Sequence, residues 1–215
     1  MEIEVNESGA RAASGVGRRA LLGAGVGGAA LSLVPFLSGH AAASATTDEP
    51  TTSTTTPPQR PTADDVALLA QAQQLELTAQ ALYDEALALS GWTDEQAVVV
   101  TYLREAHQEY ANALSGLLGR DAPGAKSEKV FAALQTDFAG SSDGVLAAAY
   151  ALEAAAAATH ADVLSQLQGT DAAALIASIQ MNEARYGTVL ADLQGNTDEA
   201  DLLVTTEAES LVGQL

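Results

Sequence analysis

Apolar residues recur every three or four positions in several segments of this chain, as expected for amphipathic helices. Acidic or hydroxyl residues precede these segments, and a glycine closes each long one. The pattern predicts long helices over about 62–91, 94–119, 143–168 and 171–195, and a short helix over about 126–138. We therefore expect an all-α chain.

The links between these segments predict how the helices are arranged. Short links join the first helix to the second and the third to the fourth, so each pair should be antiparallel. A link of about 20 residues joins the second helix to the third, which is long enough to cross a bundle. The expected fold is an antiparallel four-helix bundle with a crossover connection that carries the short helix.

The beginning of the chain has a different pattern. The uncharged run 20–39 directly follows Arg18 and Arg19, and it ends near the small-residue site of Ala43 and Ala45. The string GRRALLG resembles a twin-arginine export signal, which a receptor reads as an address. We interpret residues 1–45 as a signal peptide and the protein as exported to the cell envelope or beyond. The alternative is an anchor left uncleaved, because about 20 apolar residues span a bilayer.

The remaining segments complete the organisation of the chain. Residues 46–62 are rich in Thr and Pro and have no apolar periodicity, so they form a solvated linker. The bundle should occupy residues 63–195. Residues 196–215 carry a weaker apolar pattern and are predicted as a helical tail.

Composition and charge exclude several classes of function. The net charge is −19, and residues 1–45 are neutral, so residues 46–215 hold 25 acids against 6 bases. Such a surface cannot neutralise a row of phosphates, which excludes a nucleic-acid backbone as partner, and an anionic membrane is equally unfavourable. We expect no membrane contact after signal cleavage. The chain has no Cys and thus no disulfide or thiolate ligand.

Polar residues interrupt the apolar stripes at similar heights in the predicted bundle. Glu153 and His160 lie seven residues apart on the third stripe and hence on one face. Glu183 lies on the fourth stripe and His107 on the second, whereas Glu76 is expected beside the first stripe, at a corner of the bundle. Burying an unpaired carboxylate costs several kcal/mol, so these acids require a cation, a hydrogen-bond donor or a raised pKa.

Few basic residues are available to these acids. The four long helices contain Arg104 and Arg185 as their only arginines, and both lie off the stripes. The remaining partners are the histidines, water, a metal ion and the hydroxyl groups of four tyrosines: Tyr83, Tyr110, Tyr150 and Tyr186. We predict that these tyrosines and His160 form a polar network in the core.

Over roughly residues 64–195 the chain resembles the ferritin-like family. That family places Glu on the first helix, Glu-x-x-His on the second, Glu on the third and Glu-x-x-His on the fourth, around two metals. Glu76 matches the first Glu, and Glu153 matches that of the third helix. The strings LEAAAAATHADVL and IQMNEARYGTVLADLQG are similar to exported ferritin-like domains of actinobacteria.

The match departs from the family pattern at three positions. Glu183 is present on the fourth helix, but Tyr186 stands where the family has His. On the second helix His107 replaces Glu and Tyr110 replaces His. A two-metal oxygen-activating centre needs those ligands, so we do not expect ferroxidase, oxygenase or catalase activity.

Three functions follow as expectations. The first is an exported, non-enzymatic ferritin-like domain whose degenerate core site holds at most one metal ion, through Glu76, His107, Glu153 and Glu183. Iron, manganese or zinc would suit these ligands, and a metal-free polar core is the alternative. The second is a metal-storage or redox protein with a non-standard carboxylate and histidine centre. The third is a structural or interaction bundle of the cell envelope, with a homodimer formed through a helix face. No residue pattern identifies a substrate.

Overall fold

The computed structural model describes residues 59–196 and 208–215, and the signal and most of the linker predicted above lie outside this range. Within it the chain is all-α, as the sequence predicts, and contains no strand. The helices are α2 (Ala63–Leu87), α3 (Asp94–Leu118), α4 (Glu128–Phe138), α5 (Ser142–Gln166) and α6 (Thr170–Leu193), with a 3-10 turn, η3 (Gly119–Asp121). None of these helices is long and apolar enough to cross a membrane.

Hydroxyl side chains fix where four of the helices begin. The hydroxyls of Thr62, Ser127 and Ser141 each accept a backbone N–H from the first turn of α2, α4 and α5. α3 begins with a capping box, in which the side chains of Thr93 and Gln96 each accept the other residue's backbone N–H. Because these bonds join residues close together in the chain, the sequence alone could predict where the helices begin.

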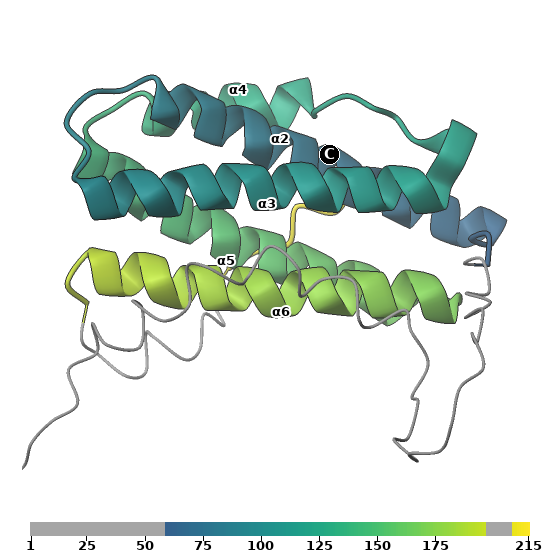
Figure 1. Cartoon of the computed structure of the whole chain (residues 1–215). Helices are drawn as coiled ribbons and strands as arrows, with labels where there is room; N and C mark the ends of the chain where they lie inside the picture. Colours follow the sequence, from purple (N-terminus) through teal and green to yellow (C-terminus); the bar gives the residue numbers. More distant parts are fainter. Residues whose placement is uncertain (1–58, 197–207) are drawn as a thin grey trace, which may run out of the picture. The chain divides into compact units, whose positions relative to one another are not determined.

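The long helices form two hairpins, α2 with α3 and α5 with α6 (Figure 1). α4 crosses between the hairpins and packs on α2 and α5. Leucine and alanine side chains supply most of the core, and a buried phenylalanine at the end of α4 joins it. The hairpins enclose the polar residues described below.

Two polar side chains of α2 hold the crossover in place. The Gln73 side chain donates to the Ala111 carbonyl and to the Ser115 hydroxyl of α3, and it accepts the backbone N–H of Gly124 at 3.0 Å. One turn and a half later on α2, the Thr78 hydroxyl accepts the backbone N–H of Ser127 at 2.9 Å. The crossover is therefore tied to α2 at two points, one just before α4 begins.

The C-terminal residues lie on α2 and α5. The backbone N–H of Leu211 donates to the Thr159 hydroxyl at 2.9 Å, and that of Gly213 donates to the Gln71 side chain at 2.9 Å. Within residues 208–215 the chain forms a turn at 212–214. The helix predicted over 196–215 is absent from this part of the tail.

Candidate metal centre

A cluster of acids and histidines lies at the centre of the bundle, and every long helix contributes to it. α2 supplies Glu76, α3 supplies His107, and α6 supplies Glu183, all fully buried. α5 supplies two members, Glu153 and His160, which are also fully buried. Glu76 therefore does not lie at a corner of the bundle, because the neighbouring helices cover the face beside the first stripe.

His107 joins two acids from different hairpins. Its Nδ1 lies 2.7 Å from Oε2 of Glu76, and its Nε2 lies 3.0 Å from Oε1 of Glu153. A ring protonated on both nitrogens can donate to both carboxylates at once. One histidine thus contacts one oxygen of each of two buried acids, without an arginine.

His160 joins a second pair of acids. Its Nδ1 lies 2.8 Å from Oε2 of Glu183, which makes a hydrogen bond. Its Nε2 lies 3.2 Å from Oε1 of Glu76, close enough for an ion pair but without the alignment of a hydrogen bond. Glu76 thus lies between the two histidines. The sequence placed His160 in the polar network, whereas the structure places it against the predicted ligands.

Three tyrosines of the network form hydrogen bonds through their hydroxyls. Tyr83 donates to Oε1 of Glu153 at 2.6 Å. The hydroxyls of Tyr110 and Tyr186, at the two positions where the family has histidine, lie 2.6 Å apart and bond to each other. Tyr150, predicted in the same network, is only partly buried on α5 and lies beside Gly187 of α6.

The electrostatic balance of the cluster favours protonated histidines. Burial alone lowers the pKa of His107, but the carboxylates of Glu153 and Glu76 outweigh it and hold that pKa well above its usual value. The pKa of His160 is also raised, because the attraction of Glu183 and Glu76 exceeds the cost of burial. The two carboxylates therefore favour the protonated, cationic form of His107.

Glu183 carries a different perturbation. Burial raises the pKa of Glu183 to about 7, although His160 beside it opposes the rise. The nearby carboxylates of Glu76 and Glu153 raise this pKa further. Glu183 therefore exchanges its proton near neutral pH.

The donor atoms are close enough to hold one cation after a rearrangement. One ligand atom each from Glu76, His107 and Glu183 lie within 4.8 Å of one another. Ligands about 2.0–2.2 Å from a zinc-sized ion in a tetrahedral site are about 3.3–3.6 Å apart, so these atoms would have to approach one another by up to about 1.5 Å. Four buried atoms among the described residues lack a hydrogen-bond partner, and all belong to this cluster: Oε1 of Glu76, Oε2 of Glu153, Oε1 of Glu183 and Nε2 of His160.

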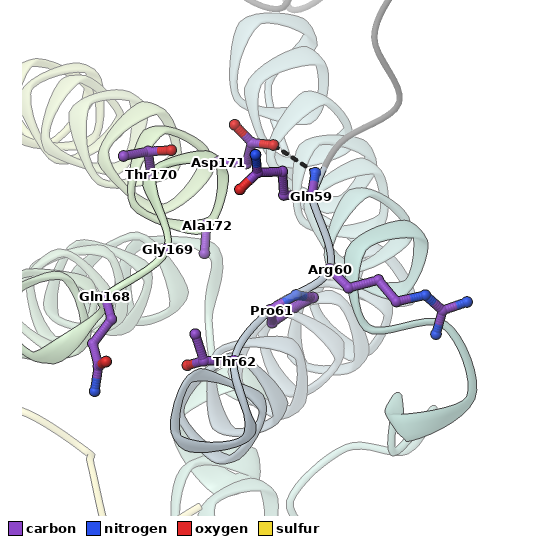
Figure 2. A pocket seen from close by; sticks show the side chains of 9 residues that line it. All are labelled: Gln59, Arg60, Pro61, Thr62, Gln168, Gly169, Thr170, Asp171 and Ala172. Carbon is purple, nitrogen blue, oxygen red and sulfur yellow. Dashed lines mark hydrogen bonds between the residues drawn. The ribbon is translucent and has the colours of Figure 1, made fainter.

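A separate hollow lies between the start of α2 and the start of α6 (Figure 2). It has a volume of about 250 Å³ and is lined by residues 59–62 and 168–172. Its one acid, Asp171, accepts the backbone N–H of Gln59 at 2.7 Å. The hollow begins about 20 Å along α2 from Glu76, given the rise of an α-helix, so it is no part of the central cluster.

Comparison with known protein families identifies the central part of this chain. Residues 64–196, more than half of the chain, match the ferritin-like domain. The chain therefore belongs to the ferritin-like domain family, in agreement with its helix order and with the position of the acidic cluster. Comparisons with curated proteins and with solved structures each return no match.

Proposed function

We propose that this ferritin-like domain binds a single divalent metal ion in its central cluster and is not an oxygen-activating enzyme. The observation that carries the proposal is a set of four buried atoms without a hydrogen bond, three of them carboxylate oxygens, in the cluster that contains Glu76, His107 and Glu183. Unpaired carboxylate oxygens in a core are costly, and a cation removes that cost. Carboxylate and imidazole ligands suit iron, manganese or zinc.

The tyrosines argue against a second ion. Burial raises the pKa of both Tyr110 and Tyr186 above the ordinary value, so neither becomes a phenolate at neutral pH. Their hydroxyls also bond to each other rather than facing an open coordination position. The family's two histidine positions therefore offer no ligand, and five side chains remain for one ion: Glu76, His107, Glu153, His160 and Glu183.

Metal binding would compete with protons for the same atoms. Both nitrogens of His107 face carboxylates, so a metal can bind one nitrogen only after its proton leaves. A metal that binds here would supply positive charge in place of the imidazolium. The residues of the chain would then hold and orient the ion, and Tyr83 would keep its bond to Glu153.

The test is a titration of chelator-treated protein with Mn(II), Fe(II) under anaerobic conditions, and Zn(II). We expect one ion per chain, release of protons on binding, and a melting temperature about 5–10 °C higher at a hundredfold excess over Kd. Glu183→Gln should abolish the shift. Glu105→Gln is the matched control, because Glu105 is an exposed acid of α3 and its variant should behave like wild type.

Absence of binding would favour the second candidate, a metal-free structural bundle. A specific observation supports that candidate: His107 and His160 already contact all three acids of the cluster. Less than about 0.1 ion per chain with no shift in melting temperature would overturn the metal-binding proposal.

The proposal includes export through the twin-arginine signal around Arg18 and Arg19, as in the exported actinobacterial domains that the sequence resembles. Its support is the paired arginines, the uncharged run 20–39 and the small residues at Ala43 and Ala45. Expression in an exporting host followed by N-terminal sequencing tests it. Cleavage after Ala45 is expected, with retention of the precursor in the Arg18→Lys, Arg19→Lys variant. Delivery of an uncleaved chain to the membrane would favour the anchor.

A further inference from the structure

Two segments, α4 and the C-terminal residues 208–215, lie across α2 and α5 and are bonded to them in the same way. Ser127, just before α4, donates its backbone N–H to the Thr78 hydroxyl of α2 at 2.9 Å. Leu211 donates its backbone N–H to the Thr159 hydroxyl of α5 at 2.9 Å. Both threonines are fully buried, and each donates its own hydroxyl hydrogen to a carbonyl one turn earlier in its helix. We call residues 208–215 the C-terminal strap.

These two contacts lie at the height of the central cluster. Thr78 follows Glu76 by two residues, about 3 Å along α2. On α5, Thr159 directly precedes His160. Glu76 and His160 contact each other across the same two helices, with Oε1 and Nε2 3.2 Å apart. The strap and the start of α4 therefore cover the part of the seam between α2 and α5 that encloses this pair.

Aromatic side chains fill the other seam between the hairpins, where α3 meets α6. The hydroxyls of Tyr110 and Tyr186 bond to each other there at 2.6 Å, and both residues are buried. The half-exposed ring of Tyr102 packs edge-on against the Tyr186 ring. An ion that approaches between the hairpins therefore meets packed tyrosines at one seam, and α4 and the strap at the other.

The strap is held less firmly than α4. α4 is a helix of 11 residues with its own backbone hydrogen bonds, and Phe138 at its end is buried against the Tyr83 ring. The strap has no helix, and its apolar side chains are only partly buried: Leu211, Val212 and Leu215. Segments with few buried apolar contacts open at low free energy while the rest of the fold stays intact. The strap can therefore detach while α4 stays in place.

We propose that the C-terminal strap is a gate to the central cluster, which opens when a metal ion enters or leaves and closes again over α2 and α5. This inference rests on the proposed function, a single ion in that cluster. The strap bonds to Thr159, Asp162 and Gln71, none of which is a candidate ligand. Opening of the strap should therefore speed entry and exit of the ion by the same factor and leave Kd unchanged.

The experiment measures Zn(II) exchange in the full-length chain and in two matched variants. Val212→Asp adds a charge at a partly buried position that packs against the core, and Gln214→Asp adds the same charge at an exposed position of the strap. A titration gives Kd, and transfer of Zn(II) to a saturating chromophoric chelator gives the dissociation rate. In Val212→Asp we expect dissociation about tenfold faster and a Kd within about twofold of wild type. Gln214→Asp should match wild type in both.

A second strap variant adds no charge. Leu211→Pro removes the N–H that the Thr159 hydroxyl accepts, and it should also speed dissociation without weakening Kd. Unchanged dissociation rates in both Val212→Asp and Leu211→Pro would overturn the gate, whereas one Zn(II) per chain would still support the proposed function. A Kd that weakens in proportion to the faster dissociation would also overturn the gate, because the strap would then stabilise the bound state. No Zn(II) in any of these proteins would overturn the proposed function, and the gate with it.

Discussion

The side chain of Asp65 joins the start of α2 to the loop between α5 and α6. It lies in the first turn of α2, yet its carboxylate accepts the backbone N–H groups of Gln168 at 2.9 Å and Gly169 at 2.8 Å, in the loop between α5 and α6. Burial by itself raises the pKa of Asp65, but the bonds from Gln168, Gly169 and Thr62 outweigh it and lower the pKa. The ionised form therefore stabilises the native state.

The variant Asp65→Asn should be destabilised, because the amide keeps the size but loses the charge that these N–H groups bind. We expect a loss of about 1.5–3 kcal/mol in the free energy of unfolding at neutral pH, measured by urea denaturation. Since the folded pKa lies below the unfolded value, the contribution of Asp65 is present above pH 3.8 and is lost as pH falls through the folded pKa. Asp64→Asn, at the exposed neighbour, should change stability by less than about 0.5 kcal/mol. Equal stability of the two variants would contradict the assignment.

At the scale of the element, local signals decided what the sequence could predict. The start of each capped helix could be predicted because the residues that form a cap, such as Thr93 and Gln96, are only three positions apart in the sequence. Hydrogen bonds between residues distant in the sequence could not be predicted. Gln73 and Thr78 hold the crossover at positions 51 and 49 residues away, and no periodicity encodes that pairing. The burial of Glu76 was missed for the same reason, since a helical wheel does not say which neighbour covers each face.

The capping box of α3 gives a prediction at this scale. Thr93→Ala removes the hydroxyl that accepts the Gln96 N–H and should cost about 1 kcal/mol in the free energy of unfolding. The control is Thr101→Ala, on the exposed face of α3, where the hydroxyl bonds only back to the Ala97 carbonyl. Its effect should be near zero or slightly stabilising, because alanine is the better helix former. Chemical denaturation measures the free energy of unfolding of both variants. A larger loss of stability in Thr101→Ala than in Thr93→Ala would show that the capping box does not stabilise α3.

For the whole molecule, the central cluster is a polar contact between the two hairpins. His107 of the first hairpin bonds to Glu153 of the second, and His160 of the second lies against Glu76 of the first. The sequence predicted every member of this cluster, but not its connectivity. His160 of α5 contacts Glu76 of α2 and Glu183 of α6 because the three helices bring these residues to the same height in the bundle. The spacing of His160 from Glu153 along α5 does not predict these contacts.

The metal-free protein should lose stability as pH rises toward and beyond neutrality. Glu183 has a folded pKa of about 7 against an ordinary value of 4.5, so the folded state binds the extra proton and its advantage disappears between those pH values. The histidines act in the same direction above pH 6.5, because their folded pKa values are also raised. Denaturation in the presence of a chelator, from pH 5 to pH 9, measures the slope.

The variant Glu183→Gln isolates one part of this pH dependence. Glutamine cannot titrate, so the decline between pH 4.5 and about 7 should flatten, while the decline above pH 6.5 from the histidines remains. Glu105→Gln, on the exposed face of α3, should keep the wild-type slope throughout. A Glu183→Gln profile identical to wild type would show that this acid does not bind the extra proton.

The contacts between hairpins also constrain the order in which the chain assembles. Each hairpin joins neighbours in sequence through a short turn, so its own contacts are local and form quickly. The acids and histidines find their partners only when the hairpins meet in one alignment. A slip of a single helical turn, 5.4 Å, would set carboxylates against leucine and alanine side chains. During folding, the cluster therefore penalises misaligned docking.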